Sequence, residues 1–346
     1  MDSPKISVLV PLYNRRHYIE QCLNSALNQT FREDYEIIVR DDGSTDGSAD
    51  FVEQRYAAEI SSGKLKLRRN EKNIGEFPTD NRLLREAAGK YIMILHSDDL
   101  YLPHALEHMY EVAELSKADV VHESFFFTTA PDGVVKNEKS LILKPYDKQP
   151  VDKITIMPND LLWRFNEWYS KSIGIDAQHN IFSRKFLMEN DLRFEPYGGN
   201  GLLAFIWIMK AKVLVKTPIP FYVYRNSPDS GTNAKCTPEY VANFISEQIN
   251  LSRRLDEIFS TEDFFKNNEE FQYLARSHIF YGKNNYWLKR PGAYKDGVTP
   301  ELNRAVEEAF KKYFGEDAAF PAFLFNWIHS AMFGKPVDVL TPPQST

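Results

Sequence analysis

Apolar runs alternate with helical patterns over the first hundred residues of the chain. The runs are rich in Val and Ile and end abruptly in polar residues, which is typical of buried parallel strands. We therefore predict an α/β fold, with a doubly wound, mostly parallel sheet and helices on both faces. The predicted strands are residues 6–14, 35–40, 64–69 and 91–95, and the predicted helices are residues 16–29 and 79–88, with Gly89 as a helix stop.

Paired polar side chains follow three of these strands. The carboxyl ends of parallel strands meet at one edge of the sheet, where ligands bind in open α/β folds. Two adjacent carboxylates repel each other unless a cation neutralises them, and a divalent metal with oxygen ligands fits that role. The three pairs are Tyr13 and Asn14, Asp41 and Asp42, and Asp98 and Asp99.

The turn after the first strand differs from the common nucleotide-binding loops. A dinucleotide-binding fold needs glycines there, and residues 11–15 contain none. The chain also lacks a GxxxxGK[ST] phosphate loop. Receiver and phosphatase-like sites also place carboxylates at strand ends, so the residues alone leave these alternatives open.

Four segments resemble the family 2 glycosyltransferases, which have the GT-A nucleotide-sugar fold. The segments keep the order and spacing of that family over residues 1–130, and a looser resemblance continues to about residue 226. They read SVLVPLYN at 7–14, IIVRDDGSTD at 37–46, NIG at 73–75 with Asn81, and HSDD at 96–99. The resemblance implies a GT-A-type sheet and a nucleotide-sugar donor.

The resemblance also implies roles for individual residues. The ring of Tyr13 would pack on the base, and Asp42 would accept a hydrogen bond from N3–H of uracil, which favours a UDP-sugar. Asp99 would bind Mn²⁺ or Mg²⁺, and Asp98 would share the metal site or contact the ribose. The metal would stabilise charge on the departing diphosphate. Many members have Asp in place of His96, which we expect to lie outside the metal's ligands.

The remaining donor-binding residues follow from the same resemblance. Asn73 and Asn81 would orient the sugar or the diphosphate, with a turn residue and a helix polar face as the alternatives. Arg225 would reach the diphosphate, with a surface salt bridge as its alternative. Pro11 and Asn14 complete the predicted donor site.

The catalytic base is the point at which the chain departs from the family. Inverting members use a carboxylate from a Glu-Asp pair that precedes a helix. The corresponding positions here are Gly199 and Asn200, and an amide does not accept the proton of the acceptor hydroxyl as a carboxylate does. Three alternatives remain: Glu195 is the base, Asp176 or His179 is the base, or the chain has lost transfer activity.

Composition and charge narrow the class of protein. The 346 residues suffice for one large α/β domain with an appendage, and 43% hydrophobic residues is ordinary for a folded protein. The net charge of −6 gives no electrostatic basis for nucleic-acid binding. With Cys22 and Cys236 as the only cysteines, no disulfide framework is indicated, and we expect Cys22 in the core.

Signal-peptide and membrane-spanning patterns in a sequence bear on where in the cell the protein acts. The first ten residues lack the pattern of a signal peptide, and no run of 18 apolar residues occurs. We expect a cytoplasmic protein that meets its sugar donor there, either free or peripheral to the inner face of the membrane.

The pattern changes after the first two thirds of the chain. We expect a glycosyltransferase domain at residues 1–235 and a helical C-terminal extension at 236–346. Within the domain, residues 1–130 would bind the nucleotide-sugar and residues 131–235 the acceptor. Pro291-Gly292 breaks the helical pattern of the extension.

Four shorter segments carry separate predictions. Residues 119–128 read as a strand with a hairpin after it, and residues 136–160 read as a loop over substrate. Trp163, Trp168 and Tyr169 suit either the core or a sugar acceptor. Residues 320–333 are aromatic and would dock on the domain or contact a membrane surface or a protein partner.

The sequence thus predicts an inverting, metal-dependent glycosyltransferase of polysaccharide biosynthesis. It would move a sugar from a UDP-sugar to a saccharide, a lipid-linked glycan or a protein acceptor. The alternative is a catalytically impaired nucleotide-sugar-binding or scaffold protein on the same fold. A nucleotidyltransferase-like enzyme is a more distant alternative, because that chemistry also uses paired carboxylates and metal.

Overall fold

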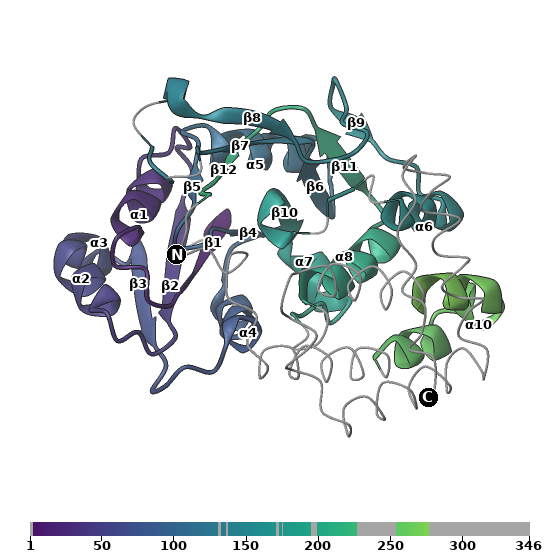
Figure 1. Ribbon diagram of the computed structural model, residues 1–346, viewed down its shortest axis with the longest axis horizontal. Coiled ribbons are helices and arrows are strands. Elements are labelled where there is room, and N and C mark those ends of the chain that lie inside the picture. The colour runs from purple at the N-terminus through teal and green to yellow at the C-terminus, as the bar shows by residue number, and fades with distance from the viewer. Residues whose placement is uncertain are drawn as a thin grey trace, which may run out of the picture. The chain divides into compact units, whose positions relative to one another are not determined.

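The computed structural model divides into two compact units, Met1–Asn233 and Ala234–Thr346. It describes residues 3–130, 133–135, 138–170, 173–174, 176–194, 199–226 and 254–276. The first unit carries two sheets and the helices around them (Figure 1). In the second unit, residues 254–276 are mostly helical and include α10 (Asp263–Lys266), where Phe259 packs on Phe265.

The larger sheet has eight strands in the order β3-β2-β1-β4-β10-β6-β11-β9. The strands β3, β2, β1 and β4 at one side of this sheet are all parallel to one another, as the alternating pattern predicts. One strand, β10, runs antiparallel to both of its neighbours in the middle of the sheet. The strands are β1 (Ile6–Leu12), β2 (Tyr35–Asp41), β3 (Leu65–Arg69), β4 (Tyr91–Ile94), β6 (Val120–Glu123), β9 (Thr155–Ile156), β10 (Asn180–Ser183) and β11 (Leu214–Thr217).

The smaller sheet has four strands in the order β5-β12-β7-β8. They are β5 (Leu100–Tyr101), β7 (Phe125–Thr128), β8 (Ile142–Pro145) and β12 (Tyr222–Tyr224). β7 and β8 pair antiparallel, which confirms the predicted hairpin. The prediction that residues 136–160 form a loop is wrong in part, because β8 and β9 lie within them.

Both faces of the larger sheet are buried, which explains why its strands read as continuous apolar runs. On one face, Val8 and Val10 belong to a core cluster with residues of α1 and α5. On the other, Leu9 and Ile38 are buried where α4 packs against β1 and β2. The helices of the first unit are α1 (Ile19–Leu27), α2 (Ser48–Arg55), α3 (Ala57–Ser61), α4 (Glu76–Glu86), α5 (Ala105–Ser116), α6 (Leu161–Tyr169), α7 (Arg184–Glu189) and α8 (Gly199–Lys210).

Several smaller predictions concern buried side chains and membrane spans. Cys22 is a buried free thiol, as predicted. Trp168 and Tyr169 are buried in the core, whereas Trp163 is only partly buried. Within the described residues, no helix is both long and apolar enough to span a bilayer. The predicted segment 320–333 lies outside the described residues.

Gly89 has a different role from the predicted helix stop. Helix α4 ends at Glu86, and the next residue is already extended. Gly89 instead lies against β1, where its N–H donates to Ser7 Oγ at 2.8 Å. A Cβ at this position would lie 2.7 Å from the carbonyl carbon of Ile6. The same Ser7 hydroxyl donates to Glu36 on β2 at 2.5 Å, so the close approach also fixes a buried polar contact between strands.

We predict that Gly89→Ala lowers the free energy of unfolding by about 1–3 kcal/mol, because the new methyl group overlaps the β1 backbone. Urea unfolding followed by circular dichroism measures the change. Gly63→Asn is the matched control, because a side chain there meets nothing within 4 Å and Asn tolerates positive φ. Equal stability of the Gly89→Ala protein and the unaltered protein would contradict the prediction.

Candidate active site

A cavity of about 700 Å³ opens at the carboxyl ends of β1, β2 and β4. It lies at the edge of the sheet where the sequence predicts a ligand site. Twelve of its lining residues come from the first hundred residues of the chain: Pro11, Leu12, Tyr13, Arg15, Asp42, Asn73, Glu76, Thr79, His96, Ser97, Asp98 and Asp99. The others are Phe126, Tyr146, Asp176, Gln178, His179 and Tyr224.

Asp42 lies just after β2 and organises one end of the cavity. Its Oδ1 accepts hydrogen bonds from Asn70 Nδ2 at 2.8 Å and from the N–H of Ile74 at 2.9 Å. Its Oδ2 accepts the N–H of Gly75 at 2.9 Å. These donors hold the 70–75 loop against the strand end, and Oδ2 keeps the capacity to accept a further donor.

The turn after β1 brings three predicted donor-site residues to the same end of the cavity. Pro11 and Tyr13 line it, and the side chain of Tyr13 is 44% exposed. Asn14 has a positive φ of 51°, and its Oδ1 accepts the N–H of Thr45 at 2.8 Å. Asn14 therefore ties the β1 turn to the β2 turn, although it is not a lining residue.

The two carboxylates of the acidic turn after β4 have different surroundings. Asp98 faces the cavity with 17% of its side chain exposed and pairs with Arg15 Nε at 3.2 Å. Asp99 is buried, and its two oxygens accept bonds from Tyr222 Oη at 2.6 Å and from the Arg225 N–H at 2.7 Å. Burial and the neighbouring Asp98 raise the pKa of Asp99 to about 7.

His96 begins this acidic turn and is surrounded by carboxylates. Burial alone would lower the pKa of its imidazole. Glu76, Asp99, Asp80 and Asp98 outweigh that cost and hold the pKa above its ordinary value. The surrounding carboxylates therefore favour the protonated form of the imidazole.

Arg225 reaches the acidic turn through the protein interior. Its Nε donates to the carbonyl of Asp98 at 2.6 Å, Nη2 to Gln21 Oε1 at 2.7 Å and Nη1 to the carbonyl of Gly133 at 2.5 Å. The residue is buried and does not line the cavity. In this structure the guanidinium fixes the turn that presents Asp98 and Asp99.

The two asparagines predicted for the donor site lie in different places. Asn73 lines the cavity and accepts the N–H of Gly75 at 3.1 Å. Asn81 lies on α4 away from the lining, and exchanges two bonds with the backbone of Phe194, at 2.6 and 2.9 Å. Asn81 thereby fixes the backbone at Phe194 against α4.

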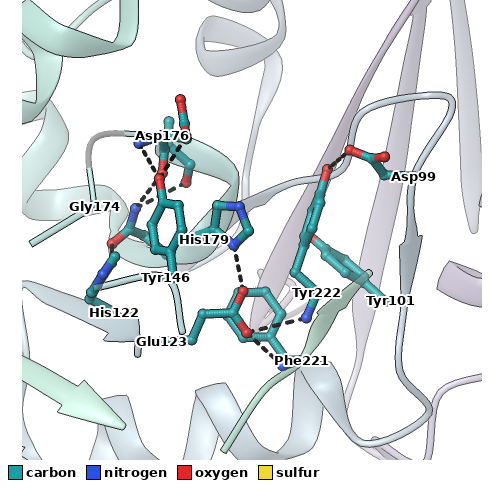
Figure 2. Close-up of polar contacts among 12 residues, drawn as sticks. Asp99, Tyr101, His122, Glu123, Tyr146, Gly174, Asp176, His179, Phe221 and Tyr222 are labelled. Atoms are coloured by element: carbon teal, nitrogen blue, oxygen red, sulfur yellow. Dashed lines mark hydrogen bonds and ion pairs between the residues drawn. The ribbon is translucent and has the colours of Figure 1, made fainter. Parts of the chain in front are cut away.

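The other end of the cavity is built by residues 120–180, which the sequence pattern only partly identifies. Tyr146 Oη donates to Asp176 Oδ2 and accepts the N–H of the same residue, both at 2.7 Å (Figure 2). His179 Nδ1 lies 2.5 Å from Oε1 of Glu123. Glu123 could have been found by the strand-end rule, because it closes the apolar run of β6. Tyr146 carries no such signal.

A buried charge cluster supports this end from behind. Asp147 contacts Lys216 Nζ at 2.7 Å and His122 Nε2 at 2.9 Å, and accepts the N–H of Gly174 at 2.9 Å. Burial would raise the pKa of the Asp147 carboxyl, but His122 and Lys216 outweigh it and lower that pKa to about 2. The cluster therefore fixes the segment that leads to Asp176.

The two predicted base positions of the acceptor side are described only in part. Glu195 lies outside the described residues. Asn200 lies in the first turn of α8, and its side chain is outside the described set. The alternatives Asp176 and His179 both line the cavity.

The oxygen donors of the acidic turn fit a hard divalent cation. Mg²⁺ and similar ions often bind one or two carboxylates and complete their shell with substrate phosphates and water. Asp98 and Asp99 supply two adjacent carboxylates at the cavity. Among the described residues there is no group of three or more His, Cys, Asp or Glu side chains placed to hold a metal by themselves. Asp98 and Asp99 would hold such an ion together with substrate phosphates and water.

Comparison with known proteins agrees with this geometry. The family model described as glycosyl transferase family 2 matches residues 7–164. These residues form a family 2 glycosyltransferase domain. The match includes the β1, β2 and β4 strand ends that form the Asp42 and Asp98–Asp99 parts of the cavity.

Curated relatives of this domain are bacterial glycosyltransferases. The chain is 33% identical to glycosyltransferase GlyG of Streptococcus pneumoniae over 38% of its own length and 42% of that protein. It is 34% identical to a poly(ribitol-phosphate) β-glucosyltransferase of Bacillus spizizenii over 37% of its length and 22% of that protein. It is 25% identical to the poly(ribitol-phosphate) β-N-acetylglucosaminyltransferase TarP of Staphylococcus aureus over 66% and 65%. The matched part is thus less than two thirds of each relative.

A solved structure has the same fold over most of this chain. S. aureus TarS residues 1–349, crystallised with UDP-GlcNAc, superposes with a TM-score of 0.65 at 20% identity. The superposition covers 94% of this chain and 87% of that one. At this identity the likeness establishes the GT-A fold.

We predict that Asn81→Ala lowers the free energy of unfolding by about 1–3 kcal/mol, because it leaves the N–H and carbonyl of Phe194 without their partner. Thermal or urea unfolding measures the change. Asn73→Ala is the matched control and should cost about 1 kcal/mol or less, because Asn73 is exposed and accepts a single backbone bond. A smaller loss for Asn81→Ala than for Asn73→Ala would contradict the prediction.

Proposed function

We propose that the protein is an inverting, metal-dependent glycosyltransferase that moves a sugar from a UDP-sugar to a glycan acceptor. The observation that carries this proposal is the joining of Asp42 and the Asp98–Asp99 turn in one cavity at the carboxyl edge of a family 2 domain. The names of TarS, crystallised with UDP-GlcNAc, and of TarP support a UDP-linked donor and a glycan acceptor.

Recognition of the donor's nucleobase is assigned to the end of the cavity at β1 and β2. Tyr13 presents an exposed ring for stacking, and Pro11 forms the floor beside it. Asp42 Oδ2 has one backbone donor and accepts N3–H of uracil as a second. Asn14 keeps this turn in place, and Asn73 faces the sugar–phosphate part of the donor.

Diphosphate binding is assigned to the acidic turn. Asp98 and Asp99 would hold Mn²⁺ or Mg²⁺, which would supply positive charge to stabilise the departing diphosphate. Asp98 supplies the accessible carboxylate, while Tyr222 and Arg225 fix the orientation of Asp99. In this proposal Arg225 contributes indirectly, because its Nε bonds to the carbonyl of Asp98 and fixes the acidic turn.

The transfer itself is a direct displacement. The oxygen of an acceptor hydroxyl forms a bond to the anomeric carbon while the bond from that carbon to the diphosphate breaks. The configuration inverts, and the hydroxyl proton passes to a base. Glycan polymers are the acceptors favoured by the relatives' names, with lipid-linked glycans and proteins as the other candidates. We place this reaction in the cytoplasm, free or at the inner face of the membrane.

A second candidate function follows from Asn200. If no other residue replaces the missing Glu-Asp pair, the protein binds nucleotide-sugars without transferring the sugar. The two candidate functions share the donor site, and only the first requires a catalytic base.

We predict that the protein hydrolyses or transfers from one UDP-sugar in the presence of Mn²⁺ and not from GDP-sugars, because Asp42 is placed to accept N3–H of a pyrimidine base. Release of the nucleotide across a donor panel, with and without Mn²⁺, tests this. UDP binding without turnover of any donor would support the binding protein, and no nucleotide binding at all would contradict both candidates.

Asp42→Ala should weaken UDP binding about tenfold and reduce the preference for UDP over GDP.

We predict that Asp98→Asn and Asp99→Asn each weaken Mn²⁺-dependent UDP binding about tenfold or more, because each removes a charged oxygen from the acidic turn. Calorimetric titration of UDP with and without Mn²⁺ measures the metal-dependent part. Asp50→Asn is the matched control, because Asp50 is an exposed carboxylate on α2. Unchanged Mn²⁺-dependent affinity in both acidic-turn variants would exclude this metal site.

A further inference from the structure

His179 is a buried imidazole on a residue that lines the cavity. It ends the 3₁₀ turn Ala177–His179, directly before β10. The residue is 3% exposed, yet it lines the cavity. Figure 2 shows it between the Tyr146–Asp176 pair and the Tyr222–Asp99 pair, which places it near the acidic turn.

Glu123 fixes the orientation of this imidazole. His179 Nδ1 lies 2.5 Å from Glu123 Oε1. Glu123 Oε2 accepts the N–H groups of Phe221 at 2.6 Å and Tyr222 at 3.2 Å. The carboxylate is completely buried and cannot rotate without breaking these bonds. The ring is also packed against Tyr146 and Tyr222, with centroids 4.0 and 4.8 Å away.

The second ring nitrogen has no such partner. Figure 2 shows Nε2 of His179 pointing away from Glu123. Among the described residues, none forms a hydrogen bond with it. A ring nitrogen without a protein partner, on a residue that lines a cavity, is suited to a substrate group.

We propose that His179 is the general base of the transfer reaction and that Glu123 positions it, in place of the acidic pair that the chain lacks at residues 199–200. The proposal rests on the proposed function, because it concerns the acceptor hydroxyl of that reaction. The arrangement is a carboxylate–imidazole dyad, and the ring nitrogen that does not contact Glu123 is the one that would accept the proton.

The proton and electron balance of the step is complete without another reactant. As the acceptor oxygen bonds to the anomeric carbon, the hydroxyl proton moves to Nε2 of His179. The electron pair of the broken bond leaves with the diphosphate. Glu123 stabilises the imidazolium through Nδ1–H, and the imidazolium later releases its proton to solvent.

Burial changes the pKa of both members of this pair. Burial lowers the pKa of His179 well below its ordinary value, and the neighbouring His122 and His96 act in the same direction, against Asp147. Burial raises the pKa of Glu123 well above its ordinary value, and Asp147 acts in the same direction, against the two peptide N–H groups that donate to the carboxyl group. The pair therefore titrates as one unit, and Nε2 is a base only while Glu123 is ionised.

Asp176 is the rival base on the same wall. Its Oδ2 accepts the hydroxyl of Tyr146, and its own N–H donates back to that hydroxyl. These two bonds hold Asp176 and Tyr146 together on the cavity wall. We therefore assign Asp176 to holding the wall of the cavity.

The test measures UDP release from the UDP-sugar that the unaltered protein turns over, with water as acceptor, for His179→Ala, His179→Gln and Asp176→Asn. We expect both His179 variants to lower kcat about a hundredfold or more. KM for the donor should stay within about threefold, because the base acts on the attacking hydroxyl. Added imidazole should restore part of the His179→Ala rate, and His17→Ala, at an exposed histidine outside the cavity, should retain the full rate.

The positioning role of Glu123 has a separate readout. The unaltered protein should lose kcat as pH falls through the pKa of the pair. Glu123→Gln should lower kcat and move this acid limb to lower pH, because the imidazolium loses its stabilising charge. Glu123→Asp should recover part of the rate. A purely structural role would lower the rate without moving the limb.

Several outcomes would overturn the proposal. They are a larger kcat loss in Asp176→Asn than in His179→Ala, a raised KM with unchanged kcat in His179→Ala, and UDP binding without turnover in the unaltered protein. Calorimetric UDP binding and thermal unfolding establish that each variant is folded. Absence of UDP binding in the unaltered protein would instead contradict the proposed function, so the two failures are distinguishable.

Discussion

The carboxylate of Glu123 links the two sheets of the first unit. Glu123 ends β6 of the larger sheet and accepts two peptide N–H groups where β12 of the smaller sheet begins. Burying a carboxylate is costly unless its oxygens are fully hydrogen-bonded, so this contact strongly favours one docking of the sheets. β12 then brings Tyr222 and Arg225 to Asp99. The acidic turn and the wall around His179 therefore depend on the same buried carboxyl group.

The half of the site formed by local sequence could be predicted. Asp42 and Asp98 each follow a short apolar run within one strand, and the parallel order of β1, β2 and β4 follows from the alternating pattern. Chain geometry alone then brings their carboxylates to one edge. The family resemblance added roles to these residues and did not change their position.

The other half depends on contacts that no local pattern carries. His179 meets Glu123 across 56 residues, and Tyr222 meets Asp99 across 123. The antiparallel β10 inserts between two parallel strands, which alternation alone does not predict. Residue type alone does not give the contacts of Arg225 and Asn81, which bond to backbone groups inside the protein. Such buried groups require partners, and only the three-dimensional arrangement shows which side chains supply them.

The position of β10 sets the smallest piece of chain that can carry the whole cavity. The family match ends at residue 164, whereas β10 lies between β4 and β6 and comes from residues 180–183. β12 and Arg225 come later still. A fragment cut at the end of the family match would therefore have a sheet divided at its centre and an acidic turn without its clamp. For this protein, the boundary for dissecting or transplanting the donor site lies no earlier than residue 226.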